Sequence, residues 1–221
     1  PQEGGSTSDA AYGHGTAVAG IIVQIAPKAT ILPIRVLSPS GGGNLDQIIQ
    51  GIYWAVDKGA HVINLSLGST TSTQALWDSI SYAASRKVYV IASAGNEATL
   101  DGITYPAAYG WWNDSTKGYV MGIGSTNDKF VLSSFSNYGY GLFASAPGEK
   151  ISTAFPQSRT IRATGTSFAA PLVSGALALA FGETSVVSER TKMFEYISES
   201  NAGGGIYARN WNQRGTDAIG S

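Results

Sequence analysis

Three side chains in this sequence are suited to acyl-transfer chemistry, and each stands directly after a glycine or a Gly-Thr pair. His14, one of only two histidines, lies between two glycines at the start of a run of small apolar residues. Ser167 follows Gly-Thr and opens a long apolar stretch, and Asn96 follows a glycine at the end of a strand-like run. An imidazole can serve as a general base, a hydroxyl as a nucleophile and a carboxamide as a donor to an oxyanion.

The helices and strand expected around these residues would hold the three side chains in positions that suit this chemistry. A serine in the first turn of a helix sits among N–H groups that lack an intrahelical partner, and these donors stabilise negative charge beside its oxygen. Pro171 is tolerated in or just after that turn, because its missing N–H costs little there. Asn96 is expected at the carboxyl end of a strand, where sites form in open α/β sheets. His14 is expected where a helix starts.

Taken singly, each of these signals also has a plain structural interpretation. A Gly-His-Gly segment is often a turn with a solvated histidine, and Gly-Thr-Ser is often a helix cap. Asn96 alone would be a turn residue that tolerates unusual backbone angles, and Ser66 to Gly68 would be the end of a strand. His61 has no such companions and precedes a strand, so we predict a structural role for it.

Strand-like and helix-like runs alternate along most of the chain, which predicts right-handed βαβ units in one α/β domain. We expect a doubly wound, mostly parallel sheet with helices on both faces, spanning residues 1–221. The helix at 45–58 is the best marked, because Asn44 can cap it and Gly59 can end it. Pro33 suggests an irregular or edge position for the first strand. Strands are expected at 31–37, 62–66, 88–92, 119–123, 143–145 and 151–153, and helices at 45–58, 76–84, 167–181 and 188–199.

Composition argues against several classes of partner and chemistry. Only 13% of the residues are charged and the formal net charge is −1, so there is no basic field to hold nucleic acid or anionic lipid. The chain has no cysteine, which excludes disulfides, thiolate metal ligands and a cysteine nucleophile. The two histidines are far apart in sequence, which argues against a zinc site. The longest apolar run, Phe168 to Phe181, is too short to span a membrane.

The three motifs occur in the order histidine, asparagine, serine, and together they resemble those of the subtilisin-like serine peptidases, the subtilase family. The segment "GHGTAVAG" resembles the histidine motif of that family, "GTSFAAP" its serine motif, and the asparagine of "ASAGNE" its oxyanion residue. Between them, "VLSPSGGGNLDQIIQGIYWAV" and "VINLSLGS" resemble the two substrate-binding edges and the helix that joins them, and "YPAAY" resembles the loop after the oxyanion residue. The resemblance covers nearly the whole chain and implies a subtilisin-like fold.

The resemblance implies a serine endopeptidase that hydrolyses extended polypeptides through an acyl-enzyme intermediate, with no cofactor required. In this interpretation His14 is the general base and acid, Ser167 is the nucleophile, and Asn96 donates to the oxyanion. Members of the family usually act outside the cytoplasm, so the resemblance implies such a location for this protein. Two edges would flank the peptide and a third segment would wall the pocket for the side chain before the cleaved bond. These segments are Gly41, Gly42 and Gly43, then Ser66, Leu67 and Gly68, and finally Ser93, Ala94 and Gly95.

The sequence departs from the family pattern ahead of the histidine. Subtilases carry an aspartate roughly thirty residues before it, in a strand of the "VAVIDTG" kind, whereas thirteen residues precede His14 here. The carboxylates among them are Glu3 and Asp9, and neither lies in an apolar strand, so we predict that Asp9 lies in a solvated loop. We therefore expect a partial chain, trimmed at both ends, in which an upstream or separate segment supplies the central strand and the catalytic aspartate.

The departure leaves several interpretations to weigh. Without the aspartate, turnover would fall by on the order of 10⁴, so the chain alone is expected to have almost no peptidase activity. A pseudopeptidase that keeps the groove as a peptide-binding module is the alternative function, although it has no chemical need for all three catalytic side chains. An α/β-hydrolase is set aside, because Gly165 to Ala169 lacks the last glycine of G-x-S-x-G. The segment "GIIVQIAPKA" leaves no room for the family's strong calcium loop, while a weaker calcium site elsewhere stays open.

Overall fold

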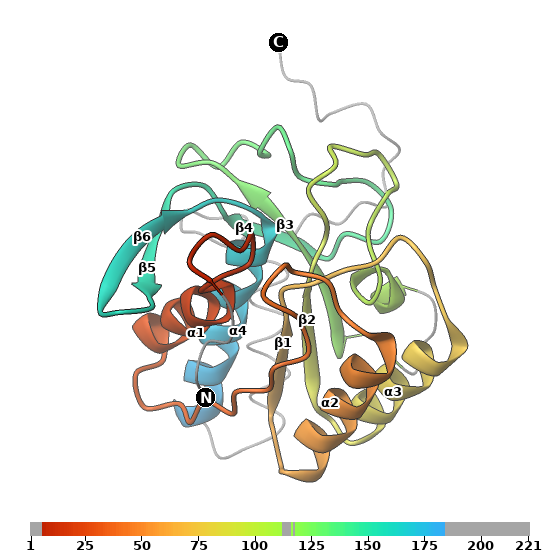
Figure 1. Ribbon diagram of the computed structural model, residues 1–221. Helices are drawn as coiled ribbons and strands as arrows, with labels where there is room; N and C mark the ends of the chain where they lie inside the picture. The colour runs from red at the N-terminus through yellow and green to blue at the C-terminus, as the bar shows by residue number, and fades with distance from the viewer. Residues whose placement is uncertain (1–5, 112–115, 117, 184–221) are drawn as a thin grey trace.

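A four-stranded, wholly parallel sheet forms the centre of the molecule (Figure 1). The computed structural model describes residues 6–111, 116 and 118–183, and the sheet within them has the strand order β1-β2-β3-β4. The register places Val62 beside Tyr89 and Val90 beside Val120. The strands are β1 (Val62–Leu65), β2 (Tyr89–Ser93), β3 (Val120–Thr126) and β4 (Ala144–Pro147).

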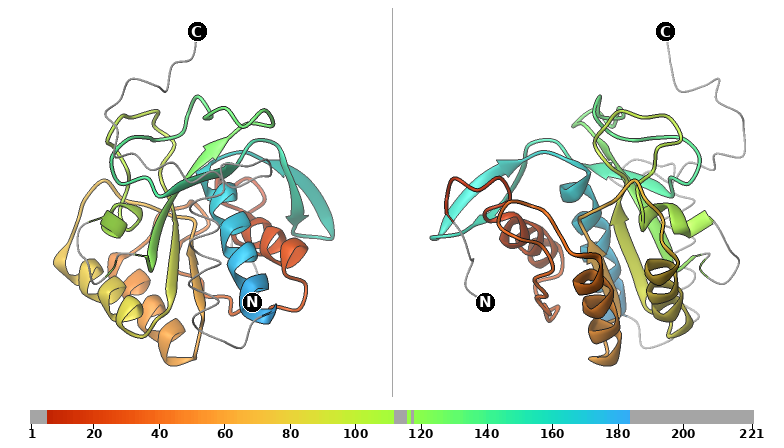
Figure 2. Two further views of the ribbon diagram at one scale, coloured as in Figure 1. Left: turned by 180° about the vertical axis from the view of Figure 1, so that it is seen from behind. Right: turned by 45° about the vertical axis from the view of Figure 1, so that its right-hand side comes forward.

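Helices cover both faces of this sheet (Figure 2). One face carries α2 and α3, the other carries α4, and α1 packs on the outside of α4. A short 3-10 helix, η1, lies between β2 and β3 in sequence, and an antiparallel hairpin of β5 and β6 packs on α1. This arrangement confirms the expected doubly wound α/β fold. The bounds are α1 (His14–Ile25), α2 (Leu45–Asp57), α3 (Gln74–Ser85), η1 (Ala107–Trp111), β5 (Ile151–Phe155), β6 (Arg159–Ala163) and α4 (Thr166–Glu183).

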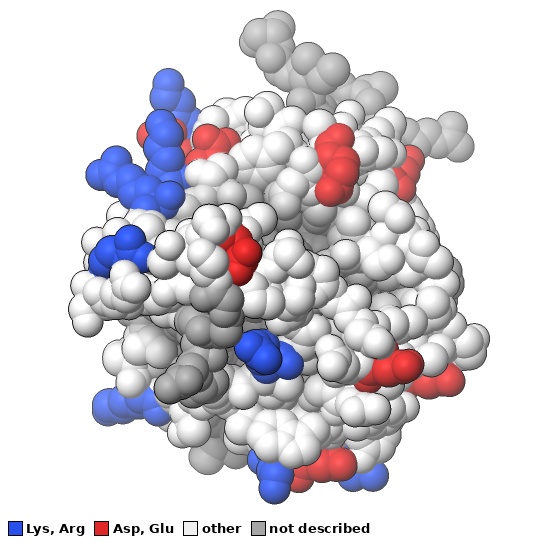
Figure 3. Space-filling model, in the orientation of Figure 1, with Lys and Arg blue, Asp and Glu red and all other residues white. Residues whose placement is uncertain are grey.

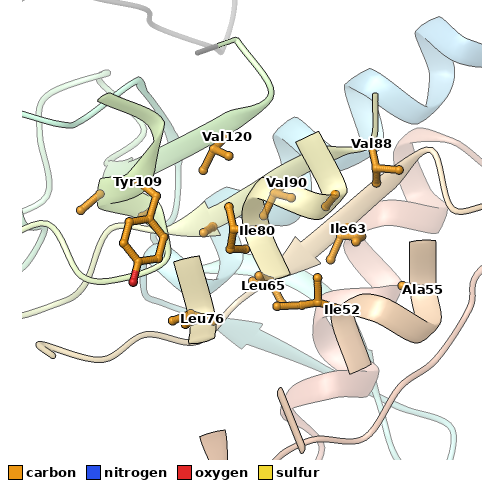
Figure 4. Packing of buried hydrophobic residues seen from close by; sticks show 14 of the residues in the cluster. Ile52, Ala55, Ile63, Leu65, Leu76, Ile80, Val88, Val90, Tyr109 and Val120 are labelled. Atoms are coloured by element: carbon orange, nitrogen blue, oxygen red, sulfur yellow. The ribbon is translucent and has the colours of Figure 1, made fainter. Parts of the chain in front are cut away.

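The second strand shows why both faces of the sheet are covered. Val90 and Ala92 belong to the cluster formed with α2 and α3, whereas Ile91 belongs to the cluster formed with α4, and all three side chains are fully buried. A parallel strand buried on both faces is apolar throughout rather than alternating. Figure 4 shows the first cluster, in which Ile52 of α2 and Ile80 of α3 pack near the strands. Burying side chains of this size contributes roughly 1.5–3 kcal/mol each.

The helices of the first cluster begin where the sequence supplies their caps. The Asn44 side chain accepts a hydrogen bond from the N–H of Asp46, and the Thr73 side chain accepts one from the N–H of Leu76. The apolar side of α2 then packs against the sheet, as its sequence pattern predicts. The helix expected at 188–199 lies outside the described residues.

One expected strand is wrong. Residues 31–36 form no strand, and Leu37 makes only an isolated bridge with Gly43. The segment makes no backbone hydrogen bond to another described residue, and Leu32 and Ile34 are 39% and 37% exposed. A strand needs a hydrogen-bonded neighbour as well as apolar residues, and within the described part of the chain residues 31–36 have no such neighbour. The apolar pattern therefore indicates a segment with a tendency to form a strand, but the described residues include no strand that pairs with it.

A glycine in an unusual backbone conformation sets the start of α1. Gly13 is the residue before the helix and has φ +76°, in the left-handed region that residues with a side chain rarely adopt. A Cβ there would also overlap the rings of Phe155 and Pro156. The turn and the close approach of the β5–β6 hairpin both depend on glycine, and together they fix the direction in which His14 leaves the backbone.

A buried asparagine holds the loop that follows β2. Asn137 is 1% exposed. Its Oδ1 accepts hydrogen bonds from the N–H groups of Glu97 and Thr99 at 3.0 and 3.1 Å. Its Nδ2 faces three acceptors, which are the carbonyls of Ala94 and Gly102 and the carboxylate of Glu97, at 2.7–3.1 Å. One side chain thereby fixes the chain on both sides of Asn96.

We expect the Gly13→Ala substitution to lower the free energy of unfolding by about 2–4 kcal/mol, because it combines left-handed backbone strain with overpacking. The measurement is urea denaturation. Gly15→Ala is the matched control, since a Cβ at Gly15 meets no heavy atom within 4 Å and the position is helical. The control should raise stability by about 0.5–1 kcal/mol. Equal effects of the two substitutions would contradict the steric account.

We expect Asn137→Ala to destabilise the protein by about 2–4 kcal/mol, because it leaves buried backbone groups without partners. Amide hydrogen exchange at Glu97 and Thr99 should accelerate in the same variant, since both amides lose their acceptor. Asn127→Ala is the comparison: Asn127 also accepts two backbone N–H bonds, but it is only half-buried and both bonds are exposed, whereas Asn137 is buried. Its cost should stay below about 1 kcal/mol. A cost for Asn127→Ala as large as that for Asn137→Ala would contradict the prediction.

Candidate functional site

The first turn of α4 fixes the orientation of the predicted oxyanion residue. The N–H of Thr166 donates to Oδ1 of Asn96 at 2.8 Å, and the hydroxyl of Thr166 donates to the same atom at 3.0 Å. A backbone N–H can only face an acceptor, so these bonds identify the oxygen end of the amide. The Nδ2 donor of Asn96 therefore points away from Thr166, and it is free to serve a group beside the exposed end of the side chain. Ser167 is the next residue of this turn.

The predicted histidine lies against the same turn of α4. His14 is the first residue of α1 and is half-buried. Its ring packs against that of Phe168, with 5.5 Å between the ring centroids. The helices α1 and α4 pack directly on one another. The structure thus brings His14, Ser167 and Asn96 together around one helix start, although they lie far apart in sequence.

A cavity of about 650 Å³, which we call the cleft, lies beside these residues. Both predicted substrate edges line it, Gly41 to Gly43 on one side and Ser66 to Gly68 on the other, and His14 lies at its margin. Flat glycine backbone on one edge leaves room for another chain to approach closely. The rest of the lining combines apolar and hydroxyl side chains, and its residues are Ala11, Leu37, Leu45, Ile48, Ser69, Thr71, Thr73, Leu76 and Tyr105.

The lining of the cleft is uncharged apart from the titratable ring of His14. None of the described residues that line it is Lys, Arg, Asp or Glu. Burial, with a smaller contribution from neighbouring Tyr109, raises the pKa of Tyr105 above its usual value, so this wall stays neutral at neutral pH. Figure 3 shows that charged side chains are sparse on the face seen in Figure 1. The cleft therefore suits a peptide held by its backbone and by apolar side chains.

The third predicted segment lies behind the cleft rather than along it. Ser93 and Ala94 are buried, and the hydroxyl of Ser93 donates to the carbonyl of Leu67 at 3.4 Å. The N–H of Gly95 donates to the hydroxyl of Thr166 at 3.3 Å. These bonds tie the end of β2 to both the second substrate edge and the first turn of α4. The proposed contact of this segment with a substrate side chain remains a prediction.

A larger cavity of about 1140 Å³, which we call the edge groove, runs along β1. Residues 30–37, which lack strand pairing, form one wall, and residues 62–67 form another. Within the described sheet β1 pairs with β2 alone, so one edge of β1 has no strand beside it there. His14 and Ser66 line both the edge groove and the cleft, and so they stand where the two cavities meet.

Asp9, the described carboxylate ahead of His14, makes its hydrogen bonds within its own turn. Asp9 closes a local turn, because its carboxylate accepts from the N–H of Ser6 at 2.7 Å and its own N–H donates to the carbonyl of Ser6. Glu3 lies outside the described residues. Across the described ranges, no group of three or more His, Cys, Asp or Glu side chains is arranged to hold a metal ion. No helix in those ranges is long and apolar enough to cross a membrane.

Sequence reasoning missed three residues that shape the site. Thr166 was visible only as part of the serine motif, yet it holds the Asn96 amide in place. Asn137 resembles an ordinary turn residue, and no local pattern connects it with a loop forty positions away. Tyr105 stands in "YPAAY", which indicated a loop but gave no sign that the ring lines the cleft.

The chain is similar in sequence and in fold to known proteins. The model of the subtilase family matches residues 2–203. Subtilisin Savinase of Lederbergia lenta is 39% identical over 183 residues, which are 79% of this chain and 64% of that protein. The cell wall-associated protease of Bacillus subtilis (strain 168) is 39% identical over 198 residues, 85% of this chain and 21% of that protein.

Among solved structures, a cold adapted subtilisin-like serine proteinase superposes with a TM-score of 0.74 at 32% identity, covering 86% of this chain and 68% of the other. The chain spans 64% of the length of Subtilisin Savinase, which is less than two thirds. The family model nevertheless covers most of the chain, including all three motifs. On this evidence the chain belongs to the subtilase family.

Proposed function

We propose that this chain carries the general base, the nucleophile and the oxyanion donor of a serine endopeptidase. His14, Ser167 and Asn96 fill these roles. One observation carries the proposal, namely that the turn holding Ser167 contacts both of the other groups. Phe168 of that turn packs on the ring of His14, and Thr166 binds the amide of Asn96. Membership of the subtilase family supports the same roles.

The proposed reaction uses only groups of the chain and the substrate. His14 removes the proton from the Ser167 hydroxyl as the oxygen attacks the peptide carbonyl. The tetrahedral oxyanion receives hydrogen bonds from Nδ2 of Asn96 and the N–H of Ser167, and a donor of this kind is worth about 3–4 kcal/mol in subtilisin itself. His14 then protonates the leaving amine, and water cleaves the acyl-enzyme by the same steps. No cofactor takes part in this sequence.

We further propose that an extended segment fills the edge groove and supplies the carboxylate that orients His14. Two walls of the groove have backbone groups without strand partners among the described residues, and an unpaired strand edge is a template on which another strand can add. The sheet is wholly parallel, so a strand added there in the same direction ends at the same edge as β1. That edge is where Ser66 and His14 line the groove.

We also propose a location outside the cytoplasm. The support is family membership and the name of the Bacillus subtilis relative, a cell wall-associated protease. Secretion of the protein into the medium of a producing culture, followed by mass spectrometry, would test this assignment directly.

A fluorophosphonate probe tests the proposed chemistry, because it bonds to an activated serine oxygen and expels fluoride. We expect the adduct to map to Ser167, in the chain alone or with a segment in the edge groove. Ser167→Ala should abolish labelling, and His14→Ala should lower its rate at least about a thousandfold. Ser85→Ala, an equal change at an exposed helix position, should have no effect. A folded protein that is labelled in neither form would instead favour the peptide-binding alternative.

The edge-groove proposal is tested by adding an apolar strand-forming segment that ends in aspartate, either fused ahead of Pro1 or as a separate peptide. We expect the labelling rate of Ser167 to rise by on the order of 10⁴ over a segment in which asparagine replaces that aspartate. The asparagine segment has the same shape and pairs the same backbone, so it isolates the carboxylate. Equal rates with the two segments would show that the groove does not deliver a catalytic acid.

A further inference from the structure

The helix that carries the predicted nucleophile has a backbone acceptor that the helix itself cannot satisfy. In an α-helix the carbonyl of Ser167 would bond to the N–H four residues later. That residue is Pro171, which lies inside α4 and has no N–H. The sequence suggested that this proline costs little, but its position leaves the carbonyl of the predicted nucleophile without its helical donor. A buried carbonyl needs another partner.

Ser66 supplies that partner. Its hydroxyl donates to the carbonyl of Ser167 at 2.7 Å, a short bond between groups 101 residues apart in sequence. The carbonyl of Ser66 lies 3.5 Å from the hydroxyl of Ser167, at the outer limit for a hydrogen bond. The residue after β1 therefore contacts both the backbone and the side chain of Ser167.

Two further residues give this contact a direction. Nδ2 of Asn64 donates to the hydroxyl oxygen of Ser66 at 3.0 Å, so the proton of Ser66 is left to face Ser167. The hydroxyl of Ser174, which is 2% exposed, has two acceptors, and Oδ1 of Asn64 at 2.9 Å is nearer than the carbonyl of Ala170 at 3.2 Å. Each group in the row donates to the next, and such chains strengthen their members.

Ser174 is buried among apolar side chains of α4, whereas Asn64 and Ser66 are half-buried and line the edge groove. The neighbours of Ser174 on α4 include Ala170, Val173 and Leu177, which pack against the sheet. Val62 of β1 packs on the same cluster, two residues before Asn64. Placing a polar group in such a layer costs free energy unless every hydrogen bond is made. The arrangement therefore calls for a reason beyond packing.

We propose that Ser174, Asn64 and Ser66 form a positioning chain that sets the place of the Ser167 backbone, and hence of its hydroxyl, relative to His14. The inference rests on the proposed function, because it concerns the same nucleophile. The three are positioning residues that act through Ser167 rather than catalytic residues. Pro171 contributes to the positioning chain, because its lack of an N–H leaves the Ser167 carbonyl available to the hydroxyl of Ser66.

The labelling rate of Ser167 by fluorophosphonate tests the chain in whichever form of the protein reacts. Ser66→Ala should lower this rate about tenfold, and Ser66→Thr, which keeps the hydroxyl, should restore most of it. Asn64→Asp keeps the shape but cannot donate to Ser66, so it should lower the rate at least threefold. Ser85→Ala is the control. With a peptide substrate, kcat should fall while KM changes less than twofold.

A double-mutant cycle with Pro171→Ala tests the origin of the effect independently of activity. Alanine restores an N–H that can reach the Ser167 carbonyl, so Ser66→Ala should shift the urea midpoint by less than half as much in that background. Full additivity would overturn the chain.

The outcomes separate the two proposals. A labelled parent whose rate is unchanged by Ser66→Ala and Asn64→Asp would overturn the positioning chain and leave the peptidase proposal standing. A folded parent that is not labelled in either form would overturn the proposed function, and the positioning role would fall with it.

Discussion

The first turn of α4 is the constraint on which the rest of the site depends. A helix start carries N–H groups without intrahelical partners. In the first turn of α4, backbone groups and side chains make fixed contacts with other parts of the site. Thr166 binds the Asn96 amide, and Phe168 packs on His14. The Ser167 carbonyl, freed by Pro171, accepts from Ser66. The relative positions of three chemical groups therefore follow from one rigid turn rather than from flexible loops.

The edge of the sheet imposes the second constraint. A parallel strand such as β1 is stable when both of its edges and both of its faces are covered. On the described chain β2 covers one edge, α2 and α4 lie on the faces, and the edge groove lies along the remainder. Any segment that pairs this edge approaches His14 at the strand's carboxyl end. Under the proposed function, one segment would therefore both pair this edge of the sheet and bring the carboxylate to His14.

Much of this arrangement could be predicted from the sequence, because the signals are local. A helix start at His14, a helix opening around Ser167 and a strand ending before Asn96 depend on neighbours within a few residues. The strand expected at 31–37 failed for a physical reason, since strand structure depends on a partner that may lie anywhere in sequence or in another chain. A run of apolar residues indicates that a segment tends to form a strand, but it does not show whether a neighbouring strand is present.

The contacts that escaped prediction share a different property, which is that they join a neutral side chain to distant backbone. Asn137 reaches Ala94 and Gly102, and Ser66 reaches Ser167, across separations that no motif encodes. Such bonds are short-ranged and do not titrate, so the framework around the site should keep its geometry over a wide range of pH and salt. The carboxylate of Glu97, which accepts from Nδ2 of Asn137, belongs to this framework as well, whereas the acid–base chemistry is assigned to His14 and the carboxylate proposed to enter from the edge groove. A chain with few charged residues can build an acid–base site in this manner, because neutral donors and acceptors supply the positions and one ionisable ring supplies the proton transfer.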